Sequence, residues 1–260
     1  QGLYWRLEDI NKSVGPINNG DLVVVGKRPE TGGTSFLASE ITHMFEQLGD
    51  KNVLIYNNEE VAYKLVTRIM SAALNIDYLT IMSAPAHWKS EYNKWLGGRR
   101  IDIVHSGEKS TSDMYRKLKH GNYGLLGVNV LLKVITPGKL EDHDKLQYIG
   151  TELRRFASEF CPIIGITQAD PSAENMKYIP QDRLYKSKTA LQGEADVLLM
   201  IGMDKDEPPN ARFINVAKNK VPPAPCCDTS ISHLRSQVEF DIRNSRFNSV
   251  LFKGNSRGQS

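Results

Sequence analysis

The stretch Asp21-Leu-Val-Val-Val-Gly-Lys-Arg-Pro-Glu-Thr-Gly-Gly-Thr-Ser-Phe36 decides the fold of this chain. Its apolar run at 22–25 is typical of a buried parallel strand, and residues 36–48 have the pattern of a helix. The turn between them carries Gly32 and Gly33. In a strand, glycine-bearing turn and helix of this kind, backbone N–H groups and the helix N-terminus face one small space that suits an anion. The stretch therefore predicts a phosphate-binding loop.

The loop departs at two positions from the full pattern for such loops, G-x-x-x-x-G-K-[ST]. Aligned on Gly32 and Thr34, the chain has Lys27 where the first glycine belongs and Gly33 where the lysine belongs. The lysine of the pattern neutralises charge on the β- and γ-phosphates, and glycine supplies no charge. Considered alone, the stretch fits a glycine-rich turn without a ligand better than a nucleotide site. A swing of Lys27 into the site is one way to replace the missing cation.

The composition fits one large α/β domain with a well-buried core: 260 residues, 40% hydrophobic and 24% charged. The net charge of +3 is too small to indicate nucleic-acid binding, so any basic patch must be local. The sequence has no run of transmembrane length and no signal-peptide pattern at its start. Its three cysteines, Cys161, Cys226 and Cys227, form no metal-binding or disulfide pattern, which fits a reducing, cytosolic setting.

Hydrophobic periodicity predicts alternating strands and helices after the first unit. Strands are expected at 51–58, 101–105, 123–134 and 162–167, and helices at 59–74, 79–95, 112–119 and 142–160. Three later strands, at 197–202, 212–217 and 237–242, have no helices between them, which indicates antiparallel additions to a parallel core. We therefore predict an α/β fold with a central, mostly parallel sheet flanked by helices. The long polar segment from Asp170 to Glu194 has little periodicity, which is typical of a functional or disordered loop.

Three polar residues stand near the ends of predicted strands, at the sheet edge where open α/β sheets bind ligands. Glu59 could orient the water that attacks a γ-phosphate, although a negative charge at a helix N-terminus explains it better when it is taken alone. Asn129 stands where this class of NTPase has a magnesium-binding aspartate, but its amide brings no negative charge. Gln168 could sense a γ-phosphate. A polar residue that closes a strand is the alternative for the two amides.

Six motifs occur in the order seen in phage replicative helicases. They are Arg-Pro-Glu-Thr-Gly (28–32), Asn-Glu-Glu (58–60), Val-Asn-Val-Leu-Leu-Lys (128–133), Thr-Gln-Ala-Asp (167–170), Ser-Lys-Thr (187–189) with Gln-Gly-Glu-Ala-Asp (192–196), and Lys-Asn-Lys (218–220). The chain resembles the RecA-type motor domain of the DnaB-like superfamily, close to the helicase half of T-odd phage primase-helicases. The resemblance covers roughly residues 7–252 and implies a RecA-like P-loop NTPase fold.

The resemblance implies a site for ATP, or for dTTP or another NTP, with Mg²⁺. The nucleotide-binding residues would be Arg28, Pro29, Glu30, Thr31, Gly32, Gly33, Thr34 and Ser35. Thr34 and Asn129 are expected at the metal, Glu59 is expected to polarise the attacking water, and Gln168 is expected to sense the γ-phosphate. Lys218 and Lys220 would reach the neighbouring subunit's nucleotide in the manner of an arginine finger, although a lysine is a point charge without a fork.

The resemblance also implies a homo-oligomeric ring, a hexamer, with nucleotide between subunits and single-stranded DNA in the central channel. A primase or other replisome protein is a further expected partner, no membrane is expected, and the expected location is the cytoplasm of a phage-infected bacterial cell. The DNA-facing loops would be residues 134–143 and 170–190. The second holds the candidate DNA-binding residues Lys177, Arg183, Lys186 and Lys188, interleaved with two tyrosines on which bases can stack. An ordinary solvated loop is the alternative.

We expect residues 1–20 to be an N-terminal linker segment, 21–253 the motor domain and 254–260 a flexible tail. The expected function is that of an ATP-dependent 5′-to-3′ replicative DNA helicase motor. Because Gly33 and Asn129 both remove charge from one site, we expect slow hydrolysis, since one such loss costs about 2.7–4 kcal/mol, or ~10²–10³ in rate. The alternatives are a non-catalytic ring subunit that binds nucleotide or single-stranded DNA (a pseudo-helicase), and a RecA-like recombinase, which fits the motifs at 192–196 and 218–220 less well.

Overall fold

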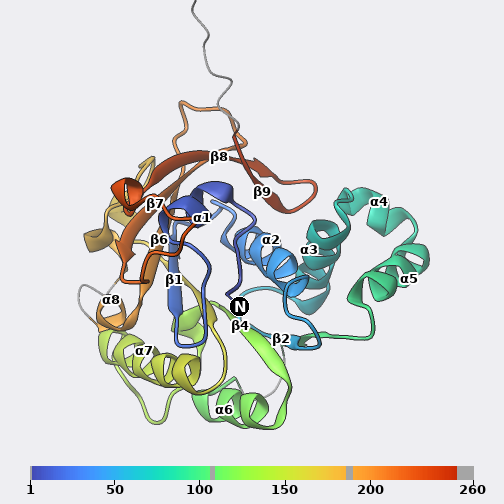
Figure 1. Cartoon of the computed structure of the whole chain (residues 1–260), viewed down its shortest axis with the longest axis horizontal. Helices are drawn as coiled ribbons and strands as arrows, with labels where there is room; N and C mark the ends of the chain where they lie inside the picture. The colour runs from blue at the N-terminus through green and yellow to red at the C-terminus, as the bar shows by residue number, and fades with distance from the viewer. Residues whose placement is uncertain (1, 106–108, 186–189, 251–260) are drawn as a thin grey trace, which may run out of the picture.

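A computed structural model describes residues 2–105, 109–185 and 190–250 (Figure 1). Within these residues, nine strands form one sheet in the order β3-β2-β4-β5-β1-β6-β7-β8-β9. The strands are β1 (Leu22–Lys27), β2 (Asn52–Asn57), β3 (Ile101–Val104), β4 (Tyr123–Asn129), β5 (Ile163–Gln168), β6 (Val197–Gly202), β7 (Ala211–Asn219), β8 (Arg235–Asp241) and β9 (Arg246–Ser249). Strands β1 to β6 pair in parallel, and β7, β8 and β9 are added antiparallel. The predicted architecture is confirmed.

Helices cover both faces of this sheet (Figure 1). They are α1 (Glu8–Ser13), α2 (Gly33–Phe45), α3 (Ala62–Leu74), α4 (Tyr78–Ser83), α5 (Pro85–Leu96), α6 (Thr111–His120), α7 (Asp142–Glu159) and α8 (Ala190–Glu194). On one face, Ile41 of α2 and Leu65 of α3 belong to a core cluster that also includes Trp5. On the other face, Met114 of α6 and Phe156 of α7 belong to a second cluster. Because both faces are covered, every residue of β1 and β2 is buried, which explains their continuous apolar runs.

The structure moves several predicted boundaries and adds two helices and one strand to the predicted elements. The strand predicted at 123–134 ends at Asn129, because Leu131–Lys133 form a 3₁₀ turn. Helix α2 begins at Gly33, so Gly33, Thr34 and Ser35 of the predicted loop form its first turn. Helices α1 and α8 and strand β9 were not predicted. Among the helices of the described residues, none combines the length and apolar character needed to cross a lipid bilayer.

The N-terminal segment packs against the helix that follows the phosphate-binding loop. Leu3, Trp5 and Leu7 are buried, and the backbone N–H of Arg6 donates to a Glu40 carboxylate oxygen on α2 at 2.7 Å. Complete burial raises the pKa of Glu40 to about 7. The N-terminal segment is thereby attached to α2, and its role as a linker stays a prediction. The predicted tail at 254–260 lies outside the described residues.

Candidate nucleotide-binding site

Three of the predicted site residues meet at the carboxyl edge of the parallel strands. Thr34 lies in the first turn of α2, Glu59 follows β2, and Asn129 ends β4. The Thr34 hydroxyl lies 3.4 Å from a Glu59 carboxylate oxygen, and the Asn129 side-chain amide donates to the same hydroxyl at 3.2 Å. Residues far apart in the chain therefore form one polar cluster, with the hydroxyl of Thr34 at its centre.

The loop between β1 and α2 is held in a conformation that requires glycine at one position. Gly32 has φ = +94°, and a Cβ there would also meet the Phe240 ring at 2.9 Å. The Thr31 hydroxyl donates to the Arg28 carbonyl at 2.8 Å, and Nε of the buried Arg212 on β7 donates to the Thr31 carbonyl at 2.9 Å. The loop is therefore fixed by its own bonds and by a side chain from β7.

Lys27, the last residue of β1, extends its side chain across the start of α2. Its ammonium nitrogen lies 3.5 Å from the carboxylate oxygen Oε1 of Glu59, and its side chain is 7% exposed. A Cβ built on Gly33 would meet the lysine's Cγ at 2.8 Å and its Cε at 2.9 Å. The ammonium group thus lies beside Glu59 and the lysine stem beside Gly33, although position 33 itself carries no charge.

Asn129 leaves a buried acceptor without a partner next to Thr34. The residue is 0% exposed, its nitrogen donates to Thr34, and its Oδ1 has no hydrogen-bond partner within the part of the chain that the structure describes. A buried polar atom left in this state is costly, and an amide oxygen is a ligand type that hard cations accept. The hydroxyl and the amide oxygen therefore fit a magnesium ion that takes its remaining ligands from phosphates and water.

Arg68 of α3 is a site residue that the sequence analysis missed. Its Nη1 donates to the Ser35 hydroxyl at 3.0 Å, and its Nε lies 3.3 Å from a Glu60 carboxylate oxygen. Burial raises the pKa of Glu60, and Arg68 opposes that shift. No local pattern in the sequence could link Arg68 to Ser35, because the contact depends on how α3 packs on α2.

Most of these groups, but not Asn129 or Glu60, line a pocket of about 220 Å³. Its lining residues are Lys27, Glu30, Gly32, Gly33, Thr34, Ser35, Glu59, Arg68, Phe240 and Ile242. Three of the predicted nucleotide-binding residues do not line it: Pro29 is exposed, and Thr31 is buried with its hydroxyl bonded to the Arg28 carbonyl. Arg28 donates to Glu174 at 2.9 Å and to the Ala169 carbonyl at 3.1 Å. Gln168 ends β5 in register with Lys27 on β1, so it lies at the same edge of the sheet.

Lys218 and Lys220, the lysines expected to act in the manner of an arginine finger, lie at the opposite edge of the sheet. Lys218 is in register with Leu198, near the start of β6, and the backbone N–H of Lys220 donates to the Asp196 carbonyl at 2.8 Å. The Lys218 ammonium donates to the Gln192 carbonyl. Burial, with a contribution from the nearby charge of Lys220, lowers the pKa of Lys218 to about 8.

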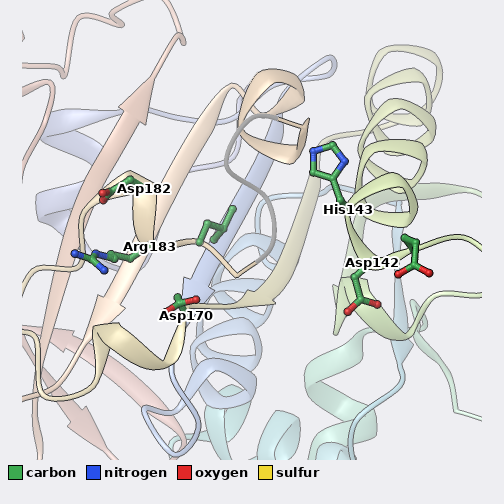
Figure 2. A pocket seen from close by; sticks show the side chains of 7 residues that line it. Asp142, His143, Asp170, Asp182 and Arg183 are labelled. Atoms are coloured by element: carbon green, nitrogen blue, oxygen red, sulfur yellow. The ribbon is translucent and has the colours of Figure 1, made fainter.

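A second and larger cavity, of about 770 Å³, lies between the loops predicted to face DNA. Figure 2 shows Asp142 and His143, at the start of α7, across from Asp170, Asp182 and Arg183. Arg183 donates to the Ser172 hydroxyl at 2.8 Å. The lining of this cavity is mainly acidic.

The structure does not bring the predicted DNA-binding residues together. The Lys177 ammonium pairs with Glu207 at 2.5 Å and with Asp204 at 3.8 Å, whereas Arg183 bonds to a different loop residue. Lys186 and Lys188 lie outside the described residues. A role for these four residues in DNA binding stays a prediction.

A family model described as "DnaB-like helicase C terminal domain" matches residues 2–240. The chain belongs to this family. The replicative DNA helicase DnaB of Buchnera aphidicola subsp. Schizaphis graminum is 24% identical over 231 residues, which cover 84% of this chain and 50% of that protein. The DnaB of Pasteurella multocida is 20% identical over 232 residues, with the same coverage. The chain thus spans about half the length of these DnaB relatives.

Two solved structures share the fold. One, of a DnaB-like replicative helicase and its interactions with primase, has a TM-score of 0.79 at 16% identity and covers 96% of this chain and 62% of that chain. The other, of an isolated ATPase domain, has the same TM-score and identity, with 96% of this chain and 92% of that chain covered. The predicted RecA-like fold and the predicted family are confirmed.

Proposed function

We propose that this chain is the motor domain of a replicative DNA helicase. In this proposal, hydrolysis of ATP, dTTP or another NTP drives translocation on single-stranded DNA and the unwinding of duplex DNA. The observation that carries the proposal is the convergence of Thr34, Glu59 and Asn129 within 3.4 Å contacts beside a glycine-bearing loop. Membership of the DnaB-like family supports the assignment.

The polar groups in the pocket and at the adjoining strand ends have tasks that their positions support. The backbone N–H groups at the start of α2 bind phosphate oxygens. The Thr34 hydroxyl and the Asn129 amide oxygen would hold Mg²⁺, which neutralises phosphate charge when it is bound. Glu59 orients the attacking water and accepts its proton. Gln168 would sense the γ-phosphate from the end of β5.

The metal site has few protein ligands. In the ranges 2–105, 109–185 and 190–250, no group of three or more His, Cys, Asp or Glu side chains could hold a metal ion. Such a sparse site is typical of Mg²⁺ that bridges protein and nucleotide. Because Asn129 contributes no charge, we infer that hydrolysis is slower than in a site with aspartate at this position, by up to about 10²–10³.

The position of Lys218 and Lys220 supports a site shared between subunits. Strands rise about 3.3 Å per residue, so Lys218 lies roughly 20 Å along β7 from Arg212, which binds the chain's own phosphate loop. A lysine side chain cannot span that distance. We infer that these lysines act on a neighbouring subunit's nucleotide in a homo-hexameric ring around single-stranded DNA, with a primase or other replisome protein as a further partner.

The proposal is tested by measuring NTP hydrolysis and helicase unwinding with and without single-stranded DNA. We expect slow hydrolysis that DNA accelerates and that rises faster than linearly with protein concentration, because the site needs a neighbour. Nucleotide binding without turnover under every condition would instead establish the non-catalytic ring subunit, which the uncharged residues at 33 and 129 favour. Strand exchange without unwinding would establish a recombinase.

A further inference from the structure

We propose that Lys27 is the phosphate-binding cation of this loop, supplied from the end of β1 in place of the lysine that position 33 lacks. The inference rests on the proposed function of the pocket as a nucleotide site. Relative to the full loop pattern, glycine and lysine have exchanged places: Lys27 stands at the glycine position and Gly33 at the lysine position. The structure explains both departures by a single rearrangement.

The stem of Lys27 occupies the space that a side chain at position 33 would need. A Cβ on Gly33 would lie 2.8 Å from Cγ, 3.1 Å from Cδ and 2.9 Å from Cε of Lys27. Real Cβ atoms essentially never approach other atoms to under 3.0 Å. The lysine therefore crosses the face of α2 at the point from which the usual lysine would start. Glycine at 33 is the residue that makes this path possible.

The side chain of Lys27 reaches the pocket in which we propose that phosphate binds. It lines the same cavity of about 220 Å³ as Gly32, Gly33 and Thr34. Lysine is almost never fully buried unless it is paired, and Lys27 is only 5% exposed. Its anionic partner is Glu59, at 3.5 Å. That distance is well beyond the ~2.7–2.9 Å of a tight charge-assisted bond, so phosphate oxygens can compete with the carboxylate for the ammonium.

This arrangement gives the Lys27–Glu59 pair two roles in sequence. Without a nucleotide, the carboxylate partners the ammonium and keeps the buried charge neutral. When a triphosphate enters, the ammonium turns to the phosphate oxygens, and Glu59 is released to bind water. The alternative is that Lys27 and Glu59 form a purely structural pair, which would affect folding and not phosphate affinity.

The test measures the binding of ATP and of AMP by calorimetry, so that no turnover is needed. Removing one charge-assisted phosphate contact should weaken ATP binding about 10- to 100-fold. We therefore expect Lys27→Met to lose this much ATP affinity and little AMP affinity. Lys51→Met is the matched control, because Lys51 lies before β2 at the opposite edge of the sheet, and it should bind ATP as the unchanged chain does.

A pair of exchange variants tests the steric part of the proposal. Gly33→Lys alone should weaken ATP binding, because two lysine stems would then compete for one path. The double variant Lys27→Gly with Gly33→Lys restores the full pattern and should bind ATP to within a few-fold of the unchanged chain. The same substitution at 33 is thus expected to harm binding beside Lys27 and to rescue it without Lys27. ATP binding by the double variant would also show that substitutions at 27 and 33 leave the chain folded, since a variant that binds ATP must be folded.

Each other result has a defined meaning. ATP binding that is unaffected in a folded Lys27→Met variant, or improved by Gly33→Lys beside Lys27, would overturn the role of Lys27 and leave the proposed function standing. If Lys27→Met does not fold, the exchange variants decide, and a double variant weaker than Gly33→Lys alone overturns the proposal. Failure of the unchanged chain to bind ATP would refute the nucleotide site itself.

Discussion

The phosphate-binding loop and the segment predicted to face DNA differ in where their charged groups point. In the loop, groups from β1, α2 and the turn after β2 face one pocket of about 220 Å³. In the segment after β5, the cavity is larger, about 770 Å³, but carboxylates dominate its lining. There Lys177 is paired with Glu207, and Arg183 is bonded to Ser172.

The difference separates a pocket that one chain forms by itself from a segment whose described basic residues are already paired within the chain. In the pocket beside the loop, the Lys27 ammonium and the Thr34 hydroxyl each already contact the Glu59 carboxylate. The basic residues of the other segment would have to exchange partners within the chain for DNA phosphates. Binding by such residues would depend strongly on salt. We therefore expect substitutions in the loop to have large effects and substitutions in the DNA-facing segment to have small ones.

The largest effect is expected from Glu59→Gln. Removing a general base typically costs 10²–10⁴-fold, so single-turnover hydrolysis should fall by about 10³-fold. ATP binding should be retained or tightened, because Lys27 no longer has a carboxylate partner in the pocket. Glu152→Gln on α7 is the control and should hydrolyse ATP normally. Unchanged hydrolysis in Glu59→Gln would exclude this residue as the base.

Asn129→Asp should raise hydrolysis, by up to about 10²-fold, because it places a carboxylate beside the Thr34 hydroxyl. The same variant should reach half-maximal rate at a lower Mg²⁺ concentration. A magnesium titration of the hydrolysis rate measures both effects. If neither the rate nor the magnesium dependence changes, position 129 does not contact the metal.

Glu40→Gln should stabilise the fold at alkaline pH. The pKa of Glu40 is raised from 4.5 to about 7, so the folded chain binds this proton more tightly than the unfolded chain, and stability falls as pH rises from 4.5 through 7. By about pH 8 the shift corresponds to a loss of roughly 3 kcal/mol. Glutamine keeps an acceptor for the Arg6 N–H without that loss. Thermal unfolding measures this effect: Glu40→Gln should unfold at a higher temperature than the unchanged chain at pH 8 and at the same temperature at pH 5.

The lowered pKa of Lys218, about 8, predicts that DNA-stimulated hydrolysis declines as pH rises above 8. The fraction of charged Lys218 falls about tenfold for each pH unit above its pKa, so activity that depends on this charge should drop by roughly tenfold at pH 9. Lys218→Arg keeps its charge at this pH and should flatten the decline. The same pH profile in both proteins would assign the decline to another group.

The smallest effect is expected at Glu207. If Lys177 contacts DNA, Glu207→Gln frees its ammonium from the ion pair and should tighten binding of an oligothymidylate a few-fold. Fluorescence anisotropy at two salt concentrations measures this change, and Lys177→Ala should reduce the salt slope by about 0.7. Weaker binding in Glu207→Gln would show that the DNA path avoids Lys177. It would also sharpen the contrast with the phosphate pocket.

The sequence predicted those parts of the molecule that follow from local chemistry. Parallel strands covered on both faces give apolar runs, and β6 at 197–202 was predicted with its observed bounds. Polar residues near strand ends predicted that Glu59 and Asn129 would lie at one edge of the sheet, and the glycine-bearing loop predicted that Thr34 would lie there too. The path of Lys27 over Gly33 could not be predicted as a contact, because it depends on how the end of β1 faces α2. Strand β9 is four residues long and forms only by pairing with β8.

Strand β7 has a consequence for mixtures of intact and inert copies. Through Arg212 it holds the chain's own loop, and near its other end it carries Lys218, the residue proposed to act on a neighbouring subunit's nucleotide. In the proposed ring, a copy with defects at both Arg212 and Lys218 would therefore inactivate two nucleotide sites, its own and its neighbour's. In a ring assembled at random, the number of active nucleotide sites should then fall with the square of the fraction of intact copies. A defective copy would therefore lower the activity of the ring by more than its share of the subunits.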